Sequence, residues 1–203
     1  MYGRRINDAL SRTLAILASE YLGIGVSMII NDNGFVLITE KEINSKDLSE
    51  IIGDLGNTDM ESLLKDNIRR TELMKRKFRH CAARSFMILR NYKGRKISIS
   101  RQQISSQSLL RASEEISPNF PVIKETYREI LEDTMDLPRA KEIARSLFSG
   151  EISHKIINTV VPSPFSHILV SFGEADVVMM KDRRKHLRDL HKKVIISIKK
   201  GAK

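Results

Sequence analysis

The segment from Arg69 to Arg101 constrains the fold most, because it is almost purely basic. It carries twelve lysines and arginines and one acidic residue, Glu72. Charged side chains are almost never fully buried without a partner, so any element formed here must keep one face in solvent. Apolar residues recur within the same segment at helical spacing. The pattern therefore predicts an amphipathic helix that packs on a core and exposes a cationic face.

The predicted helix divides into two faces when its residues are placed at about 100° per residue. The apolar face comprises Met74, Phe78, Cys81, Ser85, Phe86 and Leu89. The opposite face comprises Lys75, Arg76, Arg79, His80 and Arg90. Helical periodicity extends over residues 58–91 with a break near Thr71, and Thr58 followed by Glu61 resembles a capping box. This helix should pack through one face and line a groove with cations through the other.

The basic run continues beyond this helix into residues 92–96, where Gly94 permits a turn and a close approach of the backbone. Ser100 with Gln103 resembles a second capping box, which predicts a helix to about Ala112. The free N–H groups at such a helix start favour phosphate. The candidate nucleic-acid-binding residues are Arg76, Arg79, His80, Arg90, Lys93, Arg95, Lys96, Arg101, Gln102 and Gln103.

The rest of the chain predicts an α+β, mainly α-helical fold: a helical bundle-like domain with a small antiparallel β element. Residues 1–56 form an N-terminal subdomain, with a helix at 4–22, a β-hairpin of 26–30 and 35–39, and a helix start at Asn44. Residues 57–203 form a mainly helical basic domain. Its helices begin at Pro121 and near Asp136, a β-prone run lies at 151–161, and a further helix is expected at 175–191.

The distribution of charge favours a polyanionic partner, namely single-stranded DNA or RNA. The chain has a net charge of +10, and residues 181–203 carry ten basic and two acidic residues. Counterion release makes such clusters bind nucleic acid. Residues 112–142 carry eight acids and four bases, so a solvated face with salt bridges to this segment is the alternative. Aromatic residues make up only 5% of the chain, which predicts weak base stacking.

The sequence lacks the motifs of several classes of catalytic and binding site. Neither a phosphate-binding Gly-x-x-x-x-Gly-Lys-Ser/Thr loop nor a His-Glu-x-x-His motif occurs, so no catalytic residue, cofactor or metal is predicted. Cys81 is the one cysteine, and an inert buried thiol is expected. No apolar run is long enough to span a membrane, and a cytoplasmic location is expected. Carboxylates at Glu129, Glu132 and Asp133 leave a metal-dependent nuclease or a glycosylase as an alternative.

The sequence closely resembles the large helicase-related (Lhr) family. One run that carries the resemblance is Lys77-Phe78-Arg79-His80-Cys81-Ala82-Ala83-Arg84-Ser85. Other matching stretches occur in order and with similar spacing at 3–10, 32–35, 70–73, 87–95, 100–103, 120–122, 127–133, 162–165 and 182–184. The resemblance covers nearly the whole chain.

The resemblance implies the C-terminal domain of an ATP-dependent superfamily-two helicase that acts on DNA or RNA:DNA hybrids and is implicated in DNA repair. In that family, ATP and magnesium bind two motor domains, a winged helix follows, and the C-terminal domain lines part of the strand channel. The motor motifs do not occur in this sequence, so no ATP hydrolysis is expected from this chain alone. Two hypotheses follow: a module that binds single-stranded nucleic acid, or a structural module that docks on the motor and winged-helix domains.

Overall fold

The computed structural model describes residues 2–173 together with Lys192 and Ile195, and it divides into two compact units. Unit 1 contains residues up to Asn57 and from Ala140 onward, and unit 2 contains Thr58–Arg139. Residues from Ala140 on group with the N-terminal residues, whereas the sequence pattern groups all of 57–203 together. The predicted helix at 175–191 lies outside the described residues, as does the basic stretch 181–203 apart from those two residues.

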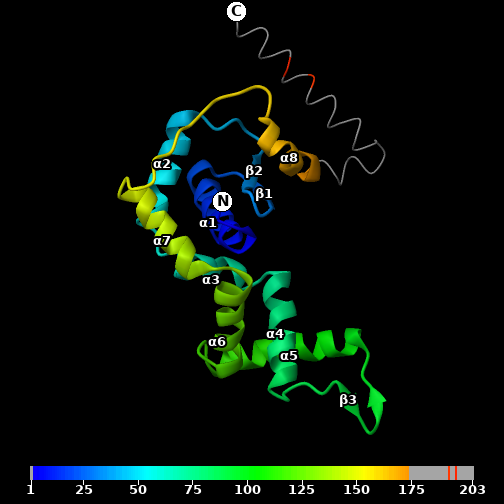
Figure 1. The fold of residues 1–203 in the computed structure, drawn as a ribbon. Coiled ribbons are helices and arrows are strands. Elements are labelled where there is room, and N and C mark those ends of the chain that lie inside the picture. The colour runs from blue at the N-terminus through cyan, green and yellow to red at the C-terminus, as the bar shows by residue number, and fades with distance from the viewer. Residues whose placement is uncertain (1, 174–191, 193–194, 196–203) are drawn as a thin grey trace, which may run out of the picture. The chain divides into compact units, whose positions relative to one another are not determined.

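Unit 1 is built around helix α1 (Arg4–Leu22), which packs against an antiparallel hairpin of β1 (Val26–Ile30) and β2 (Phe35–Thr39). Figure 1 shows this helix beside the two strands. The buried Asn7 side chain donates hydrogen bonds to the backbone carbonyls of Asn31 and Asp32, at 3.0 and 3.2 Å. These bonds attach the first turns of α1 to the hairpin loop. The predicted helix and hairpin are therefore confirmed.

The described part of unit 1 also contains three further α-helices and a short 3-10 helix, η2 (Pro164–Ser166). Helix α2 (Ser45–Leu55) begins at Asn44, whose side chain accepts the backbone N–H of Asp47 as predicted for an N-cap. Helix α7 (Leu137–Phe148) contains the division at Ala140, and helix α8 (His167–Gly173) packs on both strands of the hairpin.

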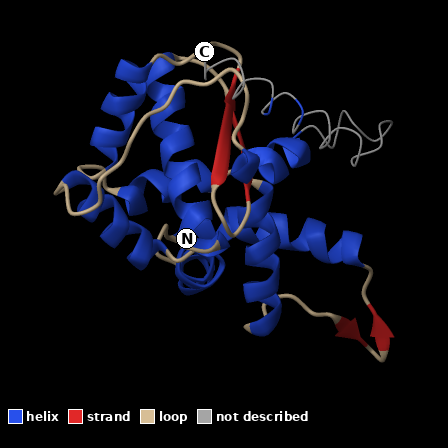
Figure 2. Ribbon diagram, turned by 45° about the horizontal axis from the view of Figure 1, so that its top comes forward, coloured by secondary structure: helices blue, strands red, loops and turns tan. Residues whose placement is uncertain are grey.

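The β-prone run at residues 151–161 forms a loop rather than a strand (Figure 2). A strand needs a partner edge, and β1 and β2 pair only with each other in the described part of the chain. Ile157 and Val160 remain exposed in this loop. High β propensity at this position therefore does not produce pairing.

Unit 2 is a small helical bundle organised around α4 (Glu72–Arg84), which packs against α5 (Ile99–Ile116) and α6 (Pro121–Arg128). Helix α3 (Met60–Ile68) precedes it, and a π-helical turn, η1 (Glu129–Thr134), continues α6. The apolar core of the unit includes Met60, Leu64, Ile68, Met74, Phe78, Cys81, Ala82, Ile88, Leu110, Val122, Ile123, Ile130, Leu131 and Met135. The break predicted near Thr71 is confirmed, because the Thr71 side chain caps α4 by accepting the N–H of Met74.

Two predicted capping boxes are displaced from the true helix starts. Helix α3 is capped by Asp59 rather than Thr58, since the Asp59 carboxylate accepts the N–H groups of Glu61 and Ser62. Helix α5 is capped by Ser98 rather than Ser100, and it extends to Ile116 rather than to about 112.

The prediction that α4 continues to about residue 91 is wrong, because the helix ends at Arg84. The N–H of Met87 bonds to the carbonyl of Ala82 at 2.9 Å, and Phe86 between them has a φ of 59°. This is the Schellman arrangement that stops helices, with a phenylalanine in the position usually taken by glycine. Phe86 and Leu89 are consequently exposed, whereas the sequence pattern places both on the apolar face.

A second hairpin, which the sequence pattern predicts only as a turn, connects α4 to α5. It consists of β3 (Asn91–Tyr92) and β4 (Arg95–Lys96), and both central residues of its turn, Lys93 and Gly94, have positive φ. That geometry matches the type I′ turn of two-residue hairpins. Figure 2 shows two separate two-stranded sheets among helices, which confirms the α+β, mainly helical class. No helix within the described ranges is both long and apolar enough to cross a bilayer.

Candidate nucleic-acid interface

Helix α4 positions the first group of candidate residues. Its inner face buries Met74, Phe78 and Ala82 completely, so the orientation of the helix is fixed by packing. Arg76 and His80 are exposed on the other face, and Arg79 is half-buried there. The sequence-derived division of this helix into an apolar and a cationic face is correct as far as its last residue, Arg84.

A pocket of about 250 Å³ lies in unit 2 where α4, the segment after it and the start of α5 meet. Its lining residues are Arg79, His80, Ala83, Arg90, Ile99 and Gln102. The Gln102 side chain donates a hydrogen bond to the Ile97 carbonyl at 2.8 Å, which fixes the amide at the pocket wall. The structure thus brings together four of the ten predicted residues: Arg79, His80, Arg90 and Gln102.

The remaining candidates lie on the same connected segment but do not line this pocket. Arg76 lies earlier on α4, and Arg101 and Gln103 lie in the first turns of α5. Lys93, Arg95 and Lys96 are exposed on the second hairpin, where the Lys93 ammonium lies 5.5 Å from the centroid of the Tyr92 ring. Ile99 lines the pocket but is absent from the predicted set, because charge patterning cannot select an aliphatic residue.

The candidate cations form no ion pair with any residue that the structure describes. This holds for Arg76, Arg79, Arg90, Lys93, Arg95, Lys96 and Arg101. The acidic segment 112–142 neutralises other residues: Glu114 pairs with Arg69, Glu129 with Arg84, and Glu125 with Arg128. Within the described residues, salt bridges from that segment therefore do not account for the basic face. The pocket keeps an excess of positive charge.

His80 is the titratable group of the pocket. Partial desolvation of the ring, which lines the pocket although the residue is largely exposed, lowers its pKa below the usual value. The nearby positive charges of Arg79, Arg90, Lys77 and Arg84 lower the pKa further. Both causes disfavour the imidazolium form. At neutral pH the ring is therefore uncharged, so one ring nitrogen can donate a hydrogen bond and the other can accept one. An anion placed in the pocket would oppose this effect and favour protonation.

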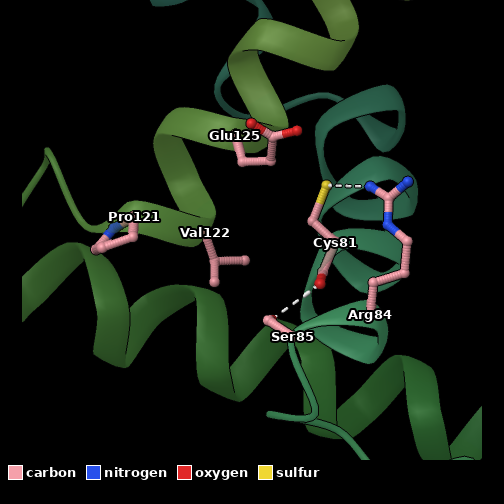
Figure 3. A pocket seen from close by; sticks show the side chains of 6 residues that line it. All are labelled: Cys81, Arg84, Ser85, Pro121, Val122 and Glu125. Atoms are coloured by element: carbon pink, nitrogen blue, oxygen red, sulfur yellow. Dashed lines mark hydrogen bonds between the residues drawn. The ribbon is translucent and has the colours of Figure 1, made fainter.

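A second pocket, of about 370 Å³, lies between α4 and α6 (Figure 3). It is lined by Cys81, Arg84, Ser85, Pro121, Val122 and Glu125, none of which lines the first pocket. The Arg84 guanidinium donates to the Cys81 sulfur at 3.3 Å, and the Ser85 hydroxyl donates to the Cys81 carbonyl at 2.9 Å. Cys81 is buried, as expected for a structural thiol.

The carboxylates considered for a nuclease are already engaged with arginines. Glu129 is buried and pairs with Arg84, while Glu132 and Asp133 pair with Arg128. Three or more metal-ligating side chains do not converge anywhere in the described part of the chain. None of these carboxylates lines the basic pocket. The arrangement of this unit favours binding of an anion over carboxylate chemistry.

The sequence is similar to a known protein family and to known helicases. The family described as "DEAD/H associated" matches residues 1–166. The ATP-dependent helicase Lhr-Core of Saccharolobus solfataricus is 46% identical over 200 residues, which are 96% of this chain and 22% of that protein. The Lhr-Core helicase of Sulfolobus acidocaldarius is 47% identical over 196 residues, again 96% of this chain and 22% of the relative. The chain thus spans about a fifth of the length of these relatives.

A solved structure shares the fold. The structure of Mycobacterium smegmatis helicase Lhr bound to ssDNA and AMP-PNP aligns with a TM-score of 0.66 at 23% identity. The alignment covers 82% of this chain and 21% of that one. At this identity the similarity establishes the fold, which agrees with the mainly helical α+β arrangement described above.

Proposed function

Because the chain belongs to the DEAD/H associated family and resembles the Lhr helicases, we propose that it binds single-stranded nucleic acid as an accessory domain of such a helicase. The observation that carries this proposal is the pocket in which Arg79, Arg90 and His80 meet without a carboxylate partner among the described residues. Phosphate oxygens are the groups that such a pocket accommodates.

The chemistry of each side chain gives its role in the proposed binding. Arg79 and Arg90 neutralise phosphates of one strand, and exposed cations of the second hairpin extend the contact along the backbone. Gln102 offers its remaining N–H and its carbonyl to sugar or base edges. ATP and magnesium would bind to the motor domains of the helicase. This chain and a winged helix would assemble with those motor domains. DNA and RNA both present the phosphates that this site requires.

The first test replaces three arginines that are free of ion pairs within the described residues. For Arg76→Ala, Arg79→Ala and Arg90→Ala combined, we expect weaker binding of a labelled single-stranded oligonucleotide. Each phosphate contact contributes about 0.7 to the slope of log affinity against log salt for single strands. Loss of three contacts should make the slope shallower by about two. Fluorescence anisotropy titrations at several salt concentrations measure both quantities.

The matched control removes the same total charge at residues that already have acidic partners. Lys46, Lys65 and Arg139 pair with Glu50, Glu61 and Asp136 on exposed surfaces. The combined alanine variant at these positions should retain the wild-type salt slope. Equal loss in both variants would attribute binding to net charge alone, and no loss in either would favour the module that docks on motor domains.

The second test uses the pH dependence of binding. Because the pKa of His80 is lowered in the free protein, a bound phosphate should raise it and binding should take up a proton. Affinity for the oligonucleotide is therefore expected to increase as pH falls from about 8 toward 5.5, the range around the ordinary histidine pKa. In His80→Gln this increase should disappear while affinity at pH 8 stays close to wild type. Unchanged pH dependence in the variant would remove His80 from the interface.

A further inference from the structure

Phe86 occupies a position that folding alone does not explain. Its side chain is 85% exposed, and its backbone has a φ of 59°, in the left-handed region that favours glycine. A bulky residue in that conformation is strained, and an exposed ring gains nothing from burial. Ile88, two residues later, is buried, so this segment packs on the unit through Ile88 and not through Phe86. Strain held at an exposed aromatic residue points to a role in binding.

Tyr92 is a second exposed ring in the same segment. It lies in β3 immediately before the I′ turn, and 58% of its surface is exposed. The hairpin has only two residues in each strand and all four are exposed, so the strands leave the ring accessible, with the Lys93 ammonium 5.5 Å from its centroid. The tight turn and the two bridging residue pairs fix the hairpin backbone that carries the ring.

The two rings stand on either side of Arg90, which lines the basic pocket. Along the chain, Tyr92 follows Arg90 by two residues, so their Cα atoms lie within about 7 Å, and Phe86 precedes it by four residues, within about 14 Å. The N–H of Ile97 bonds to the Arg90 carbonyl at 2.9 Å, which joins the base of the hairpin to the pocket wall. Exposed aromatic rings and cations therefore occur together along one short segment. These cations form no ion pair with any residue that the structure describes.

We propose that Phe86 and Tyr92 form a stacking platform for unpaired bases of the strand whose phosphates occupy the Arg79–Arg90 pocket. The inference rests on the proposed function and adds the means of selecting single strands. Only an unpaired base exposes a face that can stack on a side chain, and stacking tolerates every base. The platform therefore discriminates single strands from duplex without sequence preference. The scarcity of aromatics in the chain as a whole does not weaken stacking here, because two of them lie in the basic segment.

The test separates base contacts from phosphate contacts. The full 203-residue chain is titrated with a single-stranded oligothymidylate, an abasic strand of the same length, and a duplex. For Phe86→Ala combined with Tyr92→Ala, we expect affinity for the oligothymidylate to fall on the order of ten-fold or more, from the loss of stacking on two rings. Affinity for the abasic strand should stay within about two-fold of wild type. Leucine at both positions should behave like alanine, because leucine is apolar but cannot stack.

A glycine variant guards against misfolding as an explanation. Phe86→Gly should raise the melting temperature, since glycine adopts the left-handed conformation without strain, and yet it should bind the oligothymidylate less tightly. Equal loss of affinity for the base-containing and abasic strands, or no loss for either, overturns the stacking platform while the phosphate site stands. If wild type binds no single strand at low salt, the proposed function and this inference both fail.

Discussion

Phe78→Ala is expected to lower the free energy of unfolding by about 3–5 kcal/mol, whereas Phe86→Ala should change it by less than about 0.5 kcal/mol. Phe78 is completely buried between α4 and its neighbours, so truncation leaves a cavity that the surrounding helices can fill only in part. Phe86 is 85% exposed and leaves no cavity. Urea unfolding followed by circular dichroism measures both values, with the slope against urea checked for constancy.

The comparison is informative because the two phenylalanines are eight residues apart and belong to one apolar stripe by periodicity. A loss above about 2 kcal/mol for Phe86→Ala would mean that Phe86 is packed, and it would contradict the helix end at Arg84. A small loss for Phe78→Ala would contradict the central place of α4 in the unit. The first result would also remove the structural basis of the stacking proposal, and the second would remove that of the pocket.

The end of α4 shows why sequence periodicity fails locally. Apolar residues continue at helical spacing through Phe86 and Leu89, and neither glycine nor proline interrupts them before Gly94. The helix is instead stopped by hydrogen bonds, since the Ser85 hydroxyl returns to the Cys81 carbonyl and Met87 bonds to Ala82. The Met87 bond depends on a left-handed conformation of Phe86, which residue propensities do not anticipate.

Two helix starts are predicted correctly from single residues. The Asn44 side chain caps α2, and Pro121 stands in the first turn of α6, where its fixed φ suits the helix. At α5 the pattern selects Ser100, whereas the side chain that caps the helix is that of Ser98. The second hairpin escapes prediction because strands of two residues carry no alternating pattern.

The density of lysine and arginine predicts one part of the candidate site. The excess of lysine and arginine indicates the segment, and four of the ten candidate residues line one pocket. The sequence alone could not show which of these lysines and arginines already form ion pairs with acidic side chains. Arg69 pairs with Glu114 at 2.8 Å and Arg84 pairs with Glu129, in each case 45 residues away along the chain. Ion pairs at such separations arise from tertiary packing, and they decide which cations remain available to a ligand.

The second large effect is expected for Arg84→Met, which should destabilise the protein by about 2–3 kcal/mol. The Glu129 side chain is only 9% exposed and pairs with Arg84, so loss of the guanidinium leaves a carboxylate buried without its cation. Exposure of Arg84 itself, at 57%, places the cost below that of a fully buried pair. Arg84→Met with Glu129→Gln removes the charge together with its partner and should recover most of the loss. Urea unfolding of the two single variants and the double variant gives the coupling energy.

Arg128→Met is the matched control, because Arg128 is also an arginine of this unit held by carboxylates. Its partners Glu125, Glu132 and Asp133 are each about half exposed, and water screens pairs of that kind, so they contribute little to stability. A loss for Arg128→Met equal to that for Arg84→Met would show that burial of Glu129 does not matter. Additive losses in the Arg84 and Glu129 double variant would show that the two side chains do not interact. The expected outcome instead makes the pair an anchor of the last turn of α4, the helix that carries Arg79 and His80 of the proposed strand-binding pocket.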